Sequence, residues 1–200
     1  MIRHGYLTGC GPMEFKFGGA RFSFSFGFFA VVALYMLFDR TGIGVPAIAA
    51  VMLHEGGHIL MMKLTGAKID AMEFCPFGVR LQKRGMLGYG SEAAVYLGGV
   101  LTNALALLLA LPWGGWNLFA LSNLALIIFN LLPVGRLDGG QLLRLLLLRR
   151  LSPDHADLVR KWIGFLLLTP LFGAAFLLLP AGNYTLLFTA GYLALTLLRE

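Results

Sequence analysis

The sequence predicts an all-α polytopic membrane protein with six transmembrane helices. Its 200 residues are 58% hydrophobic and 13% charged, and the mean hydropathy of +0.78 is too high for a soluble domain of this length. Long apolar runs are separated by short polar breaks, whereas a β-barrel would alternate polar and apolar residues. We expect a single membrane-embedded domain over residues 1–200, with its core at 44–140 and no soluble regulatory domain.

Six apolar segments approach the length of about 20 residues that a spanning helix needs. They lie at 22–38, 44–62, 93–111, 116–134, 162–179 and 184–198. A further apolar stretch, LLRLLLL at 142–148, contains Arg144 and is too short to span. We expect it to lie at the membrane interface.

The segment between the second and third spans has a different pattern. Phe77, Val79 and Leu81 lie at every second position, while Pro76 and Gly78 disfavour a helix. The pattern predicts one or two short strands or a re-entrant hairpin.

The basic residues predict the orientation of the spans. The chain has 16 Lys and Arg against 10 Asp and Glu, and a cytoplasmic N-terminus puts every Lys and Arg except Arg40 on the inner side. We therefore expect a multi-pass membrane protein with both termini in the cytoplasm. The expected location is a prokaryotic cell membrane. No basic cluster stands apart on a soluble domain, so nucleic acid is not an expected partner.

The pentapeptide HEGGH at 54–58 lies in the inner half of the second expected span. Residues four apart on a helix face the same way, so His54 and His58 can bind one metal ion together. Glu55 is placed to take a proton from a metal-bound water rather than to bind the metal. The pattern indicates one Zn²⁺ per chain, because zinc with an open position generates hydroxide at neutral pH.

Other roles for this pentapeptide remain open. The same side chains can form a buried hydrogen-bonded cluster or line a proton path, although ionisable groups within a span usually serve function. Gly56 and Gly57 weaken the helix, which indicates that another backbone or the substrate passes close by. Tight helix packing explains the two glycines equally well.

HEGGH supplies two of the three protein ligands of a usual catalytic zinc site. Asp138 in RLDGGQ is the expected third ligand, because it lies at the inner end of the fourth span at a depth comparable with HEGGH. Its alternative role is to cap the helix that follows. The other histidines and carboxylates considered lie near the terminus, in loops or at span edges: His4, His155, Asp39, Asp70, Glu73 and Glu92.

Two asparagines lie inside expected spans, where an amide requires a partner. Asn130 precedes Pro133, which ends regular hydrogen bonding and lets the chain turn toward the site. Its partner is an adjacent helix or a substrate backbone. Asn103 poses the same choice, with helix packing favoured.

Four motifs occur in order: HEGGH, PFG at 76–78, GGVLTN at 98–103 and NLLPVGRLDGG at 130–140. Together they resemble the site-2 protease family of intramembrane zinc metalloproteases, and within it the compact six-span group of the stage IV sporulation protein FB type. The resemblance implies regulated intramembrane proteolysis by a zinc metalloendopeptidase near the cytoplasmic face. It implies zinc binding by His54, His58 and Asp138, general-base catalysis by Glu55, and substrate or oxyanion binding by Asn130.

The expected partners are a transmembrane or membrane-associated substrate, the lipid bilayer and regulatory membrane proteins, with self-association and a sporulation role left open. A metal-ion or proton transporter that uses the His/Glu/Asp cluster is the rival function. It needs polar groups along a continuous path, whereas these gather near one face. A non-catalytic membrane scaffold is a second rival, which the intact HEGGH together with Asp138 disfavours.

Overall fold

The computed structural model describes residues 13–17, 20–75, 78–84, 87–181 and 184–198. Within them the chain forms seven α-helices, a short 3₁₀ helix and four strands. In chain order these are β1 (Met13–Phe17), β2 (Ala20–Phe24), α1 (Phe26–Phe38), α2 (Gly44–Leu64), β3 (Lys68–Cys75), β4 (Gly78–Arg84), α3 (Tyr89–Gly114), α4 (Leu118–Leu131), α5 (Asp138–Leu147), α6 (Pro153–Leu178), η1 (Leu179–Ala181) and α7 (Thr185–Leu198).

Most helices are apolar around their whole circumference. The helices α2, α3 and α6, of 21, 26 and 26 residues, are long and apolar enough to cross a membrane, and α1, α4 and α7 are shorter apolar helices. Large apolar side chains such as Trp113, Leu166 and Leu177 are exposed. Such a surface suits lipid, which is as apolar as the side chains themselves. The chain is therefore mostly helical, as expected, with the features of an integral membrane protein.

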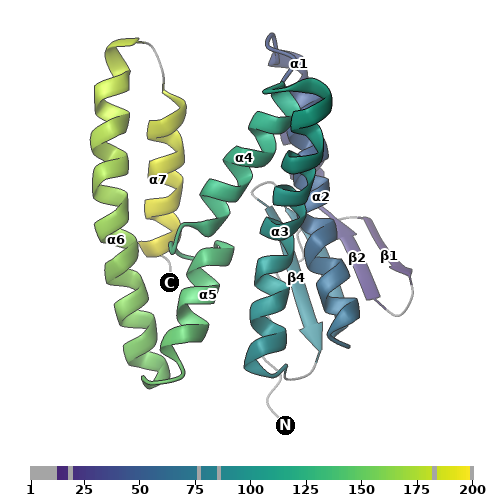
Figure 1. Ribbon diagram of the computed structural model, residues 1–200, viewed down its shortest axis with the longest axis vertical. Coiled ribbons are helices and arrows are strands. Elements are labelled where there is room, and N and C mark those ends of the chain that lie inside the picture. Colours follow the sequence, from purple (N-terminus) through teal and green to yellow (C-terminus); the bar gives the residue numbers. More distant parts are fainter. Residues whose placement is uncertain (1–12, 18–19, 76–77, 85–86, 182–183, 199–200) are drawn as a thin grey trace.

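The helices form two groups joined by α5 (Figure 1). α2, α3 and α4 pack against one another, and α6 packs against α7 in a second group. α5 contacts α3 and α4 on one side and α6 on the other. Beside this bridge, Val134 packs with Leu168, Leu193 and Leu197 in a small apolar core. The connection between α4 and α5 thus packs against the second group of helices as well as continuing from the first.

The strands form one sheet in the order β1-β2-β3-β4, of which Figure 1 labels β1, β2 and β4. β1 pairs with β2 and β3 pairs with β4 in antiparallel fashion, while β2 and β3 are parallel. A parallel pair needs a crossover connection, which α1 and α2 provide. Among the described strands, β3 is internal and β4 is an edge.

Short strands between the second and third expected spans are confirmed by β3 and β4. The expectation of an all-α chain was wrong for the N-terminal part, because β1 and β2 precede the first helix. The first expected span, 22–38, begins instead at Phe26. Residues before it pair with β3, and Ser25 caps the helix by accepting a hydrogen bond of 3.0 Å from Phe28 N. Pro76 and Phe77 lie outside the described residues.

A close approach of two backbones holds α2 against α3. A Cβ built on Gly57 would collide with Gly98 O and Thr102 Oγ1, and one built on Gly98 would lie 2.7 Å from Gly57 O. Thr102 Oγ1 in turn donates to Gly98 O at 2.9 Å. Gly57 is therefore a helix-packing glycine. Gly56 is exposed, and a Cβ there would meet nothing within 4 Å.

We expect Gly57→Ala to destabilise the protein by about 1–3 kcal/mol, because the added methyl group forces α2 and α3 apart. Gly56→Ala is the matched control on the same helix. It should leave stability unchanged or raise it by up to about 1 kcal/mol through helix propensity. Thermal unfolding of the detergent-solubilised variants measures both effects. Equal melting temperatures for the two variants would contradict the role given to Gly57.

Candidate metal centre

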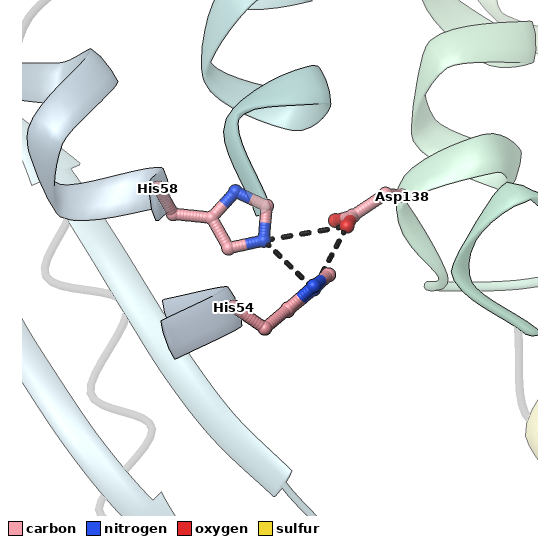
Figure 2. Close-up of side chains that lie close together, drawn as sticks. All are labelled: His54, His58 and Asp138. Carbon is pink, nitrogen blue, oxygen red and sulfur yellow. Dashed lines mark hydrogen bonds and ion pairs between the residues drawn. The ribbon is translucent and has the colours of Figure 1, made fainter. Parts of the chain in front are cut away.

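Three side chains from two distant parts of the chain meet at one point (Figure 2). His54 and His58 come from α2, and Asp138 is the first residue of α5. Asp138 Oδ2 lies 3.1 Å from His54 Nε2 and 3.3 Å from His58 Nε2, and the two Nε2 atoms are 3.2 Å apart. Each of the three atoms therefore faces the other two.

The geometry of α2 accounts for the histidine pair. The two residues are one helical turn apart, so their side chains leave the same face of the helix. Their rings lie with centroids 4.8 Å apart and planes at 87°. Both are well covered, with 6% and 12% of the His54 and His58 side chains exposed.

The turn between α4 and α5 positions Asp138 at the centre. α4 ends before Pro133, and Gly135 takes a positive φ of 53°, a conformation that suits glycine. A Cβ on Gly139 would collide with Leu131 O, and one on Gly140 with Gly135 O. These two glycines let the first turn of α5 lie directly on the backbone of the turn that precedes it.

Asp138 is not the cap of α5, which was its alternative role. The N-cap is Leu137, and no side chain caps the helix. Asp138 is instead the first residue of the helix, and its carboxylate points toward the histidines (Figure 2).

A buried arginine of α6 holds the same turn from the other side. Arg160 Nη1 donates to Gly135 O at 2.7 Å, and only 7% of the residue is exposed. Its Nη2 lies 3.6 Å from Asp157 Oδ1, and Asp157 also accepts from Arg144 of α5 at 2.6 and 3.2 Å. The α6 helix thus helps to place Asp138 although it contributes no ligand.

The second nitrogen of each imidazole has a partner of its own. His54 Nδ1 lies 2.9 Å from Asn103 Oδ1, and His58 Nδ1 lies 2.7 Å from Val95 O, both on α3. A carbonyl oxygen only accepts, so each Nδ1 carries the hydrogen and each Nε2 presents a lone pair. This arrangement is the usual one for histidines that bind a metal.

The three facing atoms suit a divalent metal ion. Asp138 Oδ2 is buried and has no hydrogen-bond donor, so its contacts with the two Nε2 atoms join acceptor to acceptor. One proton satisfies at most two of three such atoms, whereas a cation satisfies all of them. A tetrahedral zinc site with bonds of about 2.0–2.1 Å places its ligand atoms about 3.3–3.4 Å apart, close to the distances found. His54, His58 and Asp138 are therefore positioned to bind a metal ion.

Gly99 keeps the space beside the histidines open. A Cβ built on this residue of α3 would lie 2.6 Å from His58 Nε2 and 2.7 Å from His54 Nε2, closer than real Cβ contacts. Neither ring can retreat without breaking the hydrogen bond of its Nδ1 to α3. The sequence showed Gly99 only as part of a glycine pair in a span, a signal that helix packing produces equally well.

Two further residues, Glu55 and Asn130, were expected to act at the site. Glu55 is partly buried, and its carboxylate interacts electrostatically with His58, His54 and Asp138. It is not one of the three described residues that could hold a metal ion together, and its role as a base stays a prediction. Asn130 is partly buried on α4 and donates to Leu126 O of its own helix at 3.1 Å.

None of the remaining candidates in the described part of the chain joins the metal-binding group of His54, His58 and Asp138. His155 is exposed and lies 2.7 Å from Ser152 Oγ, and His4 lies outside the described residues. Asp39 accepts from Thr41 and Gly44 at the start of α2.

Gly99→Ala should weaken zinc binding at least about tenfold, because the methyl group displaces the histidines that it touches. Gly90→Ala is the control on the same helix, where a Cβ meets nothing within 4 Å. Competition with a fluorescent chelator gives the affinity, and circular dichroism checks that the helices persist. A Gly99→Ala protein that holds zinc as tightly as the wild type would refute this role.

Comparison with known proteins agrees with the geometry. Residues 87–171 match the sequence model of peptidase family M50, a range that includes Asp138 and follows the histidine pair. The chain is 32% identical over 165 residues to putative zinc metalloprotease Rip3 of Mycobacterium tuberculosis, covering 69% of this chain and 37% of that protein. It is 32% identical over 116 residues to stage IV sporulation protein FB of Bacillus subtilis, covering 53% and 40%. The chain thus spans less than half the length of these curated relatives.

The fold has a solved counterpart. The site-2 protease from Methanocaldococcus jannaschii matches with a TM-score of 0.68 over 94% of each chain, at 21% identity. The three facing ligand atoms, the family match and the shared fold lead to the same conclusion. The chain carries a peptidase family M50 domain, the domain of the site-2 proteases, as its motifs predict.

Proposed function

We propose that this chain is an intramembrane zinc metalloprotease that hydrolyses peptide bonds of transmembrane or membrane-associated substrates near the cytoplasmic face. The convergence of His54 Nε2, His58 Nε2 and Asp138 Oδ2 within 3.3 Å of one another carries the proposal. The relatives named above support it, since one is a putative zinc metalloprotease and one is a sporulation protein. A role in sporulation and in regulated intramembrane proteolysis belongs to the same proposal.

The two nitrogens and one carboxylate oxygen suit Zn²⁺, with one ion per chain. Zinc held there supplies Lewis-acid chemistry, because it polarises the scissile carbonyl and lowers the pKa of water to about 7. The chain's own residues then divide the work. Glu55 takes a proton from the attacking water as the new C–O bond forms, and then passes it to the amine nitrogen, which leaves as the C–N bond breaks.

Asn130 is the proposed residue for holding the substrate backbone or the developing oxyanion. It lies on α4, eight positions before Asp138, and its side chain is partly buried. An amide N–H aimed at the developing negative charge stabilises the transition state more than the ground state.

The substrate must be extended to be cut, since a helical peptide bond is shielded by its neighbours. We propose that it pairs with β4, whose second edge is free of partners among the described strands, while β3 is occupied on both sides.

The membrane placement we propose has six spans, formed by α1, α2, α3, α4, α6 and α7, with both termini in the cytoplasm. Three of these helices are short, and their apolar character supports their assignment. Lys63 lies in the last turn of α2, five residues after His58, and Arg136 precedes Asp138 by two positions. Both cations fit an inner-face location of the site under the positive-inside rule. The catalytic core of this single domain is residues 44–140.

A metal-ion or proton transporter is not favoured. The relatives point to proteolysis, and the polar side chains of α2 gather at one level of the helix instead of along its length. The transporter predicts ion flux in liposomes and no peptide product.

Glu55→Gln should leave zinc bound and reduce cleavage by at least about 100-fold, because the amide keeps the shape of the side chain but accepts no proton. The test compares purified wild type and variant for zinc content and for cleavage of candidate membrane substrates. Full activity in the variant would remove the proposed base.

Asp138→Asn should lower both zinc content and cleavage, because it removes the one negative charge among the three ligands. Asp154→Asn, an exposed position in the first turn of α6, is the matched control and should change neither. Zinc per chain is measured by atomic emission before and after dialysis against a chelator. Wild-type zinc content in Asp138→Asn would exclude this carboxylate as a ligand.

A further inference from the structure

A chain of buried hydrogen bonds runs through three helices and ends at one of the two histidines. Asn123 Nδ2 of α4 donates to Phe119 O at 2.8 Å. Asn103 Nδ2 of α3 donates to Asn123 Oδ1 at 2.9 Å and to Ala50 O of α2 at 3.2 Å. Asn103 Oδ1 lies 2.9 Å from His54 Nδ1. Both asparagines are completely buried, at 0% exposure.

The number of hydrogens on each group determines which partner donates in each of these hydrogen bonds. Because Asn123 Nδ2 faces a backbone carbonyl, its oxygen is the atom that faces Asn103. Ala50 O and Asn123 Oδ1 then use both hydrogens of the Asn103 amide nitrogen. Only the oxygen of Asn103 remains for His54, so His54 carries its hydrogen on Nδ1.

We propose that Asn123 and Asn103 are positioning residues that hold His54 in the tautomer with its hydrogen on Nδ1. This tautomer leaves a lone pair on Nε2, the atom that faces Asp138. A hydrogen on Nε2 would occupy the direction that a metal needs. The proposal rests on the metal site of the proposed function, but it concerns a property that the imidazole has without any metal.

The two histidines differ in what secures them. His58 Nδ1 faces the backbone oxygen of Val95, which cannot exchange its acceptor for a donor. His54 faces a side-chain amide, which can turn over and present its nitrogen instead. Turning over would set the Asn103 oxygen against Ala50 O and Asn123 Oδ1, so the orientation of Asn103 depends on Asn123.

Nitrogen-15 NMR of the metal-free full-length protein reads the tautomers directly. Replacing His4 and His155 with Gln leaves only the two imidazoles of interest, observed at about pH 8.5, where an ordinary imidazole is neutral. We expect both rings to carry the hydrogen on Nδ1. Asn123→Leu should move part of the His54 population to the Nε2 form and leave His58 unchanged.

Ser122→Ala is the matched control. Ser122 is buried beside Asn123 on α4, and its hydroxyl donates to Leu118 O at 2.7 Å, a bond of the same kind as the one Asn123 makes to its own helix. Its loss should change neither tautomer. A shift of His54 in this variant as large as in Asn123→Leu would overturn the proposal.

Zinc affinity gives a second readout. Loss of a group that orients a ligand weakens metal binding about 10- to 100-fold. We expect the zinc Kd to rise about tenfold in Asn123→Leu, where Ala50 O still orients Asn103, and closer to 100-fold in Asn103→Leu, where His54 has no acceptor.

Asn103→Asp separates tautomer control from general packing. An ionised carboxyl group accepts from His54 Nδ1 in either orientation, so it does not need Asn123 to direct this hydrogen bond, although its second oxygen then faces the acceptors Ala50 O and Asn123 Oδ1. Asn103→Asp should bind zinc more tightly than Asn103→Leu, and adding Asn123→Leu to it should not raise the Kd by more than about twofold. An equal loss from Asn123→Leu in both backgrounds would show that Asn123 acts only in packing and would overturn the proposal.

Two further outcomes also test the proposal. If Asn123→Leu fails to fold, by circular dichroism and thermal unfolding, the comparison of Asn103→Asp with Asn103→Leu stands in its place, and equal zinc loss in those two overturns the proposal. If the wild type binds no zinc, the proposed function fails while the NMR result still supports or refutes the tautomer control.

Discussion

The crossing of α2 and α3 is the constraint on which the rest of the site depends. Gly57 and Gly98 let the two backbones touch, which brings the next turns of α3 alongside the histidines. At this distance Gly99 leaves room for the rings, while Val95 O and Asn103 reach their Nδ1 atoms. One helix contact thus sets the direction of the lone pairs of the two imidazoles and the open volume beside them.

The third ligand depends on a separate part of the fold. Asp138 follows a turn that lies between the two groups of helices, and Arg160 and the apolar residues around Val134 hold that turn from the α6 side. Buried ionic groups are costly in a membrane unless they are paired, and Arg160 is paired with a carbonyl and with Asp157. The second group of helices therefore supports the site although it carries none of the ligands.

The sequence identified the three residues that meet at the centre because their information is local or follows from depth. The spacing of His54 and His58 needs only one helical turn, and the hydropathy pattern places Asp138 at a matching depth. The pairing of β2 with β3 was not predictable, because it joins segments about 50 residues apart and depends on α1 and α2 returning the chain to the sheet. Asn103 was recognised as a polar residue in a span, but its partners depend on how three helices are rotated. A glycine that makes room for a neighbouring side chain, as Gly99 does, looks the same in a sequence as a glycine that lets a neighbouring helix pack closely.

The unequal supports of the two histidines have a consequence for heritable variation. His58 relies on the peptide group of Val95, and no exchange of the side chain at that position removes a carbonyl. His54 relies on the side chain of Asn103, which a single codon change can alter. Natural drift or laboratory selection can therefore change the hydrogen bond that orients His54 while the hydrogen bond of His58 stays the same. A graded series of metal affinities is accessible within this scaffold without touching any ligand.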